Sequence, residues 1–424
     1  MTQQLKKYSF LPWIIWGLSA LFYFYEFLLQ VSPNVIAEDL MREFHMDGAA
    51  LGYCGALYFW SYALMQIPVG ILLDRFGSRK WLTIAAFVCA LGSFGFASSS
   101  SIIAADLSRT LMGFGSAFAA VGCLNLAARW FSSKHFALLT GLMVTIGMLG
   151  AAFGEEPFAL VIGTMGWRHA LFALGWIGLF LSALMWLVIR DYPKGKHPRI
   201  SPTKAPLWEG LRRVISNRQS WIAAIYGGLM FAPTPILGAL WGTSFIEHSY
   251  HFSHTTAAGM SSAIFIGWII GCPFFGWLSD HFCLRKPPMY IASVGALISA
   301  LLFIYLPIWS PLVLAVLLAF FGFISSGFAP AFSIVREINP HRYSATSLGF
   351  MNMANTLGAA AAQPAIGIIL DTLWTGTMNN GARIYSVHQY QIALSAIPIM
   401  ILLSLFLLPF IRETRCVGYE ENHA

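Results

Sequence analysis

Charged residues are scarce in this chain. Only 10% of its 424 residues are Asp, Glu, Lys or Arg, whereas 57% are hydrophobic. Soluble globular domains carry about 25% charged residues, which cover the surface that faces water. The composition therefore excludes an ordinary soluble protein and indicates a chain that folds in a lipid bilayer.

Motifs that mark other classes of protein are missing as well. The six cysteines form no CxxC pair, and the sequence contains neither an HExxH motif nor a phosphate-binding loop. We therefore expect no metal centre, no cofactor and no enzymatic activity, and we expect the cysteines to be small packing residues. Without an ATP-binding loop, any transport must draw on a gradient of an ion or a solute.

Long apolar runs are abundant instead. A membrane-spanning helix needs roughly 20 mainly apolar residues, and no alternation typical of membrane-spanning strands is visible. We expect the run after Met1–Ser9 to be a retained first helix, because no small-residue cleavage site of a signal peptide follows it. In total we predict twelve spanning helices, at residues 10–34, 49–73, 80–100, 101–128, 136–163, 167–190, 220–247, 254–279, 287–308, 310–335, 345–373 and 387–411.

The basic residues are distributed unevenly over the predicted loops. The net charge is +7, and 21 of the 25 Lys and Arg residues lie in the termini, the central segment and the loops on the same side. The opposite side holds only Arg42, Arg168 and Arg383, and Arg109 lies within a span. This pattern obeys the positive-inside rule, so we predict two cytoplasmic termini and no nucleic-acid partner. The compact loops and short tails lead us to expect a bacterial inner membrane.

The central segment divides the chain. Residues 191–219 are rich in proline and basic residues, and Leu211, Val214 and Arg213 suit a short amphipathic helix on the inner leaflet. We predict a first six-helix bundle at 1–190, a cytoplasmic linker at 191–219, and a second six-helix bundle with a short tail at 220–424.

An internal repeat supports this division. The segment Gly70–Lys80 follows the second predicted span, and Gly276–Lys286 follows the eighth; Gly, Asp, Arg and Lys recur 206 residues apart. A second repeat pairs Glu156-Pro157 with Gln363-Pro364, 207 residues apart. Duplication of a six-helix unit, with both copies in the same orientation, produces such a pattern.

The repeated loops resemble those of a known family. The first is similar to the loop between helices two and three of the major facilitator superfamily, and Arg109-Thr-Leu-Met-Gly113 resembles that family's fourth-helix motif. The resemblance covers residues 13–412 and implies alternating access around a substrate site near mid-membrane. It also implies that the loops control the conformational change through Gly70, Asp74, Arg75, Gly77, Arg79, Lys80, Gly276, Asp280, Arg285 and Lys286.

Ionisable residues within the spans are functional candidates, because a charge at the centre of a bilayer costs about 2.5–3.5 kcal/mol. The deep ones all lie in the first half: Glu26, Asp106, Arg109, Glu155 and Glu156. We take Glu26, Arg109, Glu155 and Glu156 as candidates for proton coupling. The second half is then expected to supply neutral contacts to the substrate.

Alternatives stay open for these carboxyl groups. Glu26 either couples protons or binds substrate, or it forms a static ion pair with Arg109. Glu155 and Glu156 are adjacent and cannot point in the same direction from one helix. The repeat with Gln363 favours Glu156 as the inward one, whereas the rival interpretation leaves both at a hydrated helix end.

Polar and aromatic residues in the spans are candidates for the substrate cavity. Pro233 and Pro235 predict a break in the seventh span, and broken helices often line transporter cavities. The superfamily's exporters often carry a Gly-Pro motif in the fifth helix that this chain lacks, which favours uptake. The cavity candidates are Tyr25, Gln30, Tyr58, Trp60, Trp241, Trp268, Asn352, Asn355 and Gln363.

Three hypotheses for the function follow. The first is a monomeric secondary transporter that takes up a small polar or amphiphilic metabolite with protons. That metabolite is either like an amino acid or peptide, or like an organic acid or siderophore. The second is an antiporter that exports hydrophobic compounds in exchange for protons. The third is a membrane sensor or scaffold that transports nothing, and an added signalling domain would be its mark.

Overall fold

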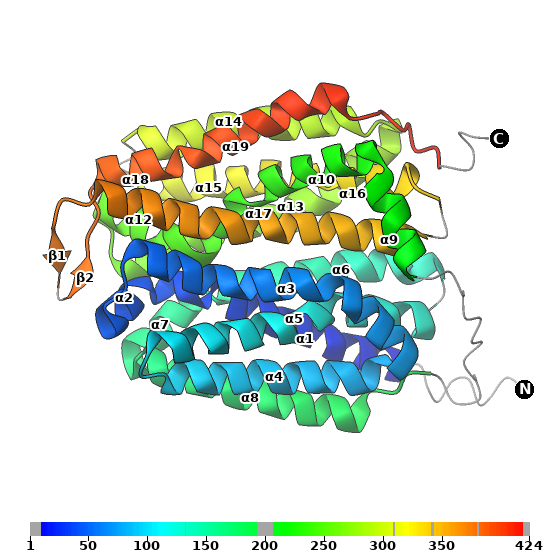
Figure 1. The fold of residues 1–424 in the computed structure, drawn as a ribbon, viewed down its shortest axis with the longest axis horizontal. Helices are drawn as coiled ribbons and strands as arrows, with labels where there is room; N and C mark the ends of the chain where they lie inside the picture. The colour runs from blue at the N-terminus through cyan, green and yellow to red at the C-terminus, as the bar shows by residue number, and fades with distance from the viewer. Residues whose placement is uncertain are drawn as a thin grey trace, which may run out of the picture.

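The fold consists of long helices that run between two opposite ends of the molecule (Figure 1). The computed structural model describes residues 10–131, 133–192, 207–307, 310–340, 343–379 and 381–418. We call the end where the first helix begins and the last one stops the terminal end. The opposite end, which carries the short helix α2 (Ala37–Phe44) and the strands β1 (Met378–Asn379) and β2 (Ala382–Arg383), is the distal end.

The first half of the chain forms one bundle, in the lower part of Figure 1. Side-chain caps begin two of its helices, because Asp47 accepts a hydrogen bond from the main-chain N–H of Ala50 and Ser101 accepts one from that of Ala104. Its helices are α1 (Leu11–Val35), α3 (Gly48–Phe76), α4 (Ser78–Ser98), α5 (Ile102–Trp130), α6 (Ser133–Phe153), α7 (Glu156–Met165) and α8 (Trp167–Val188).

The second half forms a matching bundle in the upper part of Figure 1. It is entered through the short helix α9 (Leu207–Ser216), which lies within the predicted linker; residues 193–206 of that linker lie outside the described residues. The helices of the second bundle are α10 (Arg218–Phe231), α11 (Pro233–Ile236), η2 (Leu237–Trp241), α12 (Gly242–Tyr250), α13 (His254–Phe282), α14 (Lys286–Tyr305), α15 (Pro311–Ser325), η3 (Ser326–Phe328), α16 (Pro330–Glu337), α17 (Ser344–Leu373), α18 (Val387–Leu394), α19 (Ala396–Leu407) and η5 (Leu408–Phe410).

The prediction of twelve spans in two bundles is confirmed. Eleven helical stretches are long and apolar enough to cross a membrane, and α3, with 29 residues, completes the set. Large apolar side chains such as Leu64, Leu107 and Phe180 are more than 60% exposed on the outside of the bundles. Side chains of this kind on a chain so poor in charge face lipid.

Several spans are interrupted. Pro233 and Pro235 separate α10 from the π-helical segment η2, as the sequence predicts, because proline removes a hydrogen-bond donor and clashes with the preceding turn. Pro330 follows a similar break between α15 and α16, which we did not predict. Pro157 lies in the first turn of α7, after α6 has ended at Phe153. These breaks free main-chain groups inside the bundles.

Helices α3 and α17 join the bundles. A side chain at Gly52 would lie 2.6 Å from the carbonyl oxygen of Gln363, and one at Gly48 would lie 3.1 Å from that of Gly367. Only glycine allows two backbones to approach so closely. The N–H groups of Gly48 and Ala49 also donate to the Asp371 carboxylate, over 2.9 and 2.6 Å. The acidic end of α17 thus caps α3 across the interface.

Candidate functional site

Helix α1 presents three polar side chains to the interior of the protein. Glu26, Gln30 and Asn34 are spaced four residues apart, so they lie on one face of the helix. They are 2%, 8% and 0% exposed. This face is the centre of the candidate site, because it carries Glu26 and is hydrogen-bonded to both Arg109 and Glu155.

Glu26 is held by a tyrosine. The hydroxyl of Tyr58 donates to Oε1 of Glu26 over 2.9 Å, while Oε2 of Glu26 is buried and has no hydrogen-bond partner among the described residues. A buried carboxyl with one unsatisfied oxygen can accept a proton or a donor from a ligand without breaking an existing bond. The placement agrees with Glu26 as a proton-coupling candidate, a role that stays a prediction.

Arg109 lies on the other side of the same tyrosine. Its guanidinium donates to the carbonyl oxygens of Leu29 over 2.9 Å and Gln30 over 3.4 Å, and it lies 4.8 Å from the centre of the Tyr58 ring. The side chain is 1% exposed, and its Nε has no partner among the described residues. Arg109 and Glu26 form no ion pair, so the alternative of a static pair is wrong.

A second cluster joins the bundles near the distal end; we call it the Glu155 cluster. Asn34 donates to both carboxyl oxygens of Glu155, over 2.8 and 3.0 Å, and to Ser261 over 3.1 Å. Thr243 donates its hydroxyl to Glu155 over 3.3 Å, and its N–H to Oδ1 of Asn34 over 3.2 Å. A carboxyl group of the first bundle is therefore bound from α12 and linked through Asn34 to α13.

The preference for Glu156 as the inward carboxyl is wrong. Glu155 is 0% exposed, whereas Glu156 is exposed and lies over Gly259 of α13. The reason is the break between α6 and α7: Glu155 has φ −100° and ψ −107° and precedes the first turn of α7, so its side chain leaves the helical path. The sequence repeat pairs Glu156 with Gln363, but it gives no sign that the chain changes direction at Glu155.

Two of the predicted cavity residues lie elsewhere. Trp60 is 42% exposed, on the face of α3 that also carries the exposed Tyr53 and Leu64, so it faces lipid. Tyr25 is buried, but its hydroxyl donates to the carbonyl oxygen of Leu174 in α8 over 2.9 Å, inside the first bundle. Neither side chain points to the interface between the bundles.

Of the other cavity candidates, Asn352, Trp241 and Gln363 lie at or beside that interface, whereas the contacts of Asn355 and Trp268 lie within the second bundle. Asn352 donates to Gln66 of the first bundle over 3.0 Å. The indole of Trp241 donates to the carbonyl oxygen of Gln363 over 3.3 Å, next to the approach of α3. Asn355 is buried toward Gly227 of α10. Trp268 donates to Thr234, beside the break in the seventh span, over 3.2 Å. Their contact with substrate stays a prediction.

The two repeated loops differ in how they are tied down. In the second, Arg285 pairs with Glu337 over 2.7 Å and with Asp280 over 2.5 Å. Glu413 accepts hydrogen bonds from the N–H groups of Arg285 and Lys286. Partial burial opposes the charge of Glu413, but these bonds outweigh it and hold its pKa below the ordinary value.

In the first loop, the N–H of Arg79 donates to Asp191 over 3.0 Å, and Arg129 lies 3.7 Å from the same carboxylate. The side chains of Asp74 and Arg75 lie outside the described residues. The loop's partners, Asp191 here and Glu337 and Glu413 in the second copy, were not predicted. Asp191 and Glu413 are acids that follow the last span of each half, a signal that a search of the repeat ends would have found, whereas Glu337 is the last residue of α16.

The distal end also carries a pair of histidines that we call the histidine latch. His248 of α12 contacts Glu38 of α2 over 2.6 Å. His254 contacts Glu247 over 2.8 Å and the carbonyl oxygen of Val35 over 2.8 Å. With the Glu155 cluster and Asp371, these contacts join the bundles at the distal end. The Gln66–Asn352 hydrogen bond also joins the bundles, nearer the terminal end.

Comparison with known proteins decides the family. The sequence profile of the Major Facilitator Superfamily matches residues 15–363. The chain belongs to this superfamily. A solved structure of a bacterial homologue of the human lysosomal transporter Spinster, inward-facing and unoccupied, has a TM-score of 0.79, with 15% identity over 96% of this chain and 97% of that one. The Major Facilitator fold and secondary transport by alternating access are therefore established for this multi-pass membrane protein.

Curated relatives are transporters. The chain is 26% identical to the uncharacterized transporter YybO of Bacillus subtilis (strain 168), over 68% of this chain and 69% of that one. It is 24% identical to the probable galactarate/D-glucarate transporter GudP of Escherichia coli (strain K12), over 85% and 87%. It is also 24% identical to a D-galactonate transporter of Escherichia coli O6:H1, over 79% and 84%.

Proposed function

We propose that this Major Facilitator protein takes up a small organic acid together with protons. One observation carries the proposal: Glu26 and Arg109 are both buried against Tyr58 without pairing with each other. A buried guanidinium that lacks a carboxylate partner favours an anion from outside the protein. Glu26 then supplies a separate group that can take up and release a proton.

The chemistry of the surroundings supports a hydroxylated acid. Amide groups of Gln66 and Asn352 meet between the bundles, and Gln30 follows Glu26 on the same helix face. Amides donate and accept hydrogen bonds, which suits a substrate with several hydroxyl groups. GudP is named for galactarate and D-glucarate, which combine carboxylates with hydroxyls. We propose a substrate of that class for this chain.

The charge distribution supports the proposed orientation of the protein in the membrane. The terminal end carries most of the Lys and Arg residues, so we propose that it faces the cytoplasm of a bacterial cell. The contacts that join the bundles at the distal end support the proposal of an inward-facing state. Proton binding from the outside, where the proton potential is higher, would drive the uptake.

Proteoliposomes with a pH dye in the lumen test this proposal. An inward proton gradient and added galactarate, D-glucarate or D-galactonate should acidify the lumen and accumulate labelled acid. Glu26→Gln should abolish acidification and accumulation, while exchange of labelled for unlabelled acid across the membrane continues. Trp60→Phe, on the lipid face, is the matched control and should behave as wild type.

Each outcome is decisive. Uptake of the acid without acidification would refute proton coupling and leave a uniporter. Acidification with amino acids or peptides, and none with these acids, would refute the substrate class. Loss of exchange in Glu26→Gln would show that Glu26 binds the substrate itself.

A further inference from the structure

A cysteine takes the place of a glycine in the second of the repeated loops. Cys283 corresponds to Gly77 of the first loop, 206 residues earlier, and both residues have positive φ, 49° and 85°. Each is the C-terminal cap of the long helix before its loop, α13 or α3. Glycine and asparagine are the usual residues in such left-handed positions, because a side chain crowds the backbone there. The turn alone therefore does not explain a cysteine at this point.

The chain after η5, residues 411–418, which we call the tail, is bound to the same loop. Glu413 of the tail accepts hydrogen bonds from the N–H groups of Arg285 and Lys286, over 2.9 and 2.8 Å. In the first copy, Asp191 accepts the corresponding bond from the N–H of Arg79 over 3.0 Å. The sequence after Asp191 contains no cysteine near this bond, whereas the tail does. The two copies thus share the acid but differ in the thiols.

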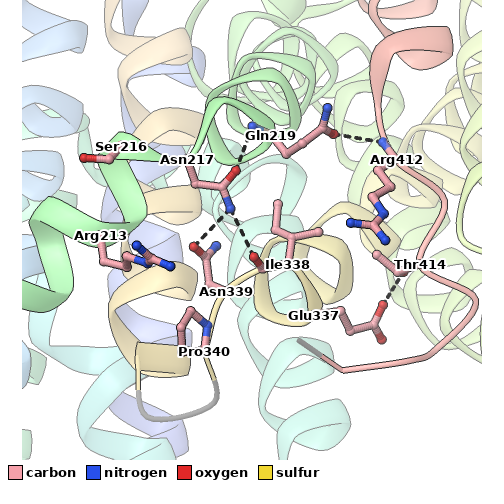
Figure 2. A pocket seen from close by; sticks show the side chains of 10 residues that line it. All are labelled: Arg213, Ser216, Asn217, Gln219, Glu337, Ile338, Asn339, Pro340, Arg412 and Thr414. Carbon is pink, nitrogen blue, oxygen red and sulfur yellow. Dashed lines mark hydrogen bonds between the residues drawn. The ribbon is translucent and has the colours of Figure 1, made fainter. Parts of the chain in front are cut away.

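A turn of the tail presents the second cysteine. The Thr414 hydroxyl donates to Glu337, the last residue of α16 (Figure 2). The N–H of Val417 donates to the carbonyl oxygen of Thr414 over 3.0 Å, and the residues between them, Arg415 and Cys416, have positive φ, 50° and 62°. Cys416 is therefore a second cysteine in a left-handed position. Residues other than glycine are uncommon there, and such strain clusters at functional sites.

The two thiols meet at the surface. The Cys283 thiol donates to the carbonyl oxygen of Asp280 over 3.5 Å, and its sulfur is in hydrogen-bond contact with the thiol of Cys416. Cys283 is exposed and Cys416 is half-buried. Partial burial raises the pKa of the Cys416 thiol to about 11; the charge of Arg285 opposes this and the Cys283 thiol adds to it. Cys416 therefore rests as a thiol, and Cys283 is the sulfur that a reagent in solution reaches first.

Other cysteines of the chain provide a contrast. Cys54, Cys89 and Cys123 are buried in helices of the first bundle, as expected for small packing residues. Cys283 is exposed, so the expectation of a packing residue is wrong for this thiol. An accessible cysteine with a second thiol in contact is typical of a redox-responsive site.

We propose that Cys283 and Cys416 form a reversible disulfide that slows transport under oxidising conditions. The oxidant is a small disulfide, such as oxidised glutathione. The Cys283 thiol loses its proton to water, and its sulfur attacks one sulfur of the small disulfide and releases a small thiolate, which takes up a proton. Cys416 then loses its proton and attacks the Cys283 sulfur, which releases the second small thiol. Two protein thiols are oxidised, and one small disulfide is reduced to two thiols.

The disulfide would act on a loop that the family resemblance implicates in the conformational change. Hydrogen bonds between the loop and the tail, such as those of Glu413, can break when the bundles move, but a covalent bond cannot. At the end that we propose to face the cytoplasm, thiols are normally kept reduced. The bond would therefore form only when the cell is oxidised, and it would then hold the loop to the tail.

Peptide mass spectrometry of the full-length protein, incubated in detergent with oxidised glutathione, tests the site. Wild type should form the Cys283–Cys416 disulfide, and dithiothreitol should remove it. Protein oxidised before reconstitution should take up the proposed acids about fivefold more slowly or less, because the loop stays tied to the tail, and reduction should restore the rate. Cys283→Gly, which gives the second loop the glycine of the first, and Cys416→Ser should keep the reduced rate within about twofold and lose the response.

The outcomes separate this proposal from the proposed function. Glutathione adducts on Cys283 without the cross-link, a cross-link that leaves uptake unchanged, or inhibition that persists in Cys283→Gly would each overturn it. The uptake readout rests on the proposed function, whereas the cross-link does not. Absence of uptake by reduced wild type would refute the proposed function, and the cross-link would still decide whether the two thiols form a redox site.

Discussion

The two bundles share an architecture but divide their polar chemistry unequally. The first buries Glu26, Arg109 and Glu155, each at most 2% exposed. The second buries amides at the corresponding depth, such as Asn355 and Gln363, and breaks two of its spans at prolines. The comparison teaches that a duplicated six-helix unit can concentrate its buried charge in one copy, although both copies contain broken spans.

This division has a physical basis. Each buried charge needs fixed partners. Helix α1 supplies them for Arg109 through the carbonyl oxygens of Leu29 and Gln30, whereas Glu155, at the break between α6 and α7, is bound by Asn34 and by Thr243 of the second bundle. Broken helices move more easily, because they have lost main-chain hydrogen bonds. The buried charges of the first bundle are therefore the candidates for the proposed proton and anion chemistry.

The largest effect is expected at Arg109. Arg109→Gln should lower the initial uptake rate about 100-fold or more, because it removes the charge that would bind the acid and leaves buried carbonyls without donors. Arg109→Lys should not restore it, since one ammonium cannot span both carbonyl oxygens. Uptake normalised to the amount of protein in the membrane measures this. A rate above a tenth of wild type in Arg109→Gln would show that the first bundle's charge is only structural.

The Glu155 cluster should show the next effect. Glu155→Ala leaves buried donors of Asn34 and Thr243 unpaired, at about 1–3 kcal/mol, which shifts the distal end toward opening by roughly 5- to 150-fold. Labelling of Val35→Cys by an impermeant maleimide reports the opening. Glu156→Ala is the matched control and should change the labelling little. Equal labelling in both variants would mean that the buried carboxyl does not join the bundles.

The histidine latch predicts a pH dependence of closure at the distal end. Burial opposes the charge of Glu38, but the hydrogen bond and charge of His248, with His254 and Arg42, outweigh it and lower the pKa of Glu38. Asp39, Glu247 and the ring of Tyr390 also face this pair. Glu38 therefore stabilises closure above its ordinary pKa of about 4.3, and loses this as the pH falls through the lowered value.

His248 sets the upper limit of the pH range in which the histidine latch stabilises closure. Closure weakens as His248 loses its proton with rising pH, because the ion pair becomes a neutral hydrogen bond. Labelling of Val35→Cys should therefore rise between about pH 6 and pH 8. His248→Gln should flatten this rise, and His388→Gln, an exposed histidine at the same end, should not. A slope unchanged by His248→Gln would refute the latch.

The smallest effects are expected from the tryptophans. Trp60→Phe keeps an apolar ring against lipid and should change uptake less than about twofold. Trp241→Phe loses the hydrogen bond to Gln363 in the second bundle and should lower uptake about three- to tenfold. Parallel uptake assays of both variants measure the difference. Equal effects would contradict the assignment of Trp60 to the lipid face.

Much of the fold is predictable because membrane spans are a local property. Each span needs its own apolar run, and each is visible without reference to the others. The broken seventh span follows equally from Pro233 and Pro235. The sequence does not show which face of each helix is buried, because in a bilayer the lipid side and the packed side are both apolar. Trp60 and Tyr25 therefore look alike in sequence but lie in different surroundings.

The Glu155 cluster shows the limit of the sequence most clearly. Asn34, Thr243 and Ser261 are single small polar residues in apolar helices, and Asn34 and Ser261 are 227 residues apart in the chain. No local pattern distinguishes them from polar residues that bond only within their own helix, as Ser32 does to Leu29. Their meaning comes from the packing of α1, α12 and α13 around one carboxyl group.

The sequence by itself determines the bilayer environment, the twelve spans, the repeat and the candidate charges, because scarcity of charge and length of apolar runs act residue by residue. Only the tertiary structure decides which carboxyl is buried, that Tyr58 lies between Glu26 and Arg109, and which end joins the bundles. Those choices depend on how separate helices approach one another. Glycine contacts and helix breaks set that approach, and they have their effect only when the partner helix is in place.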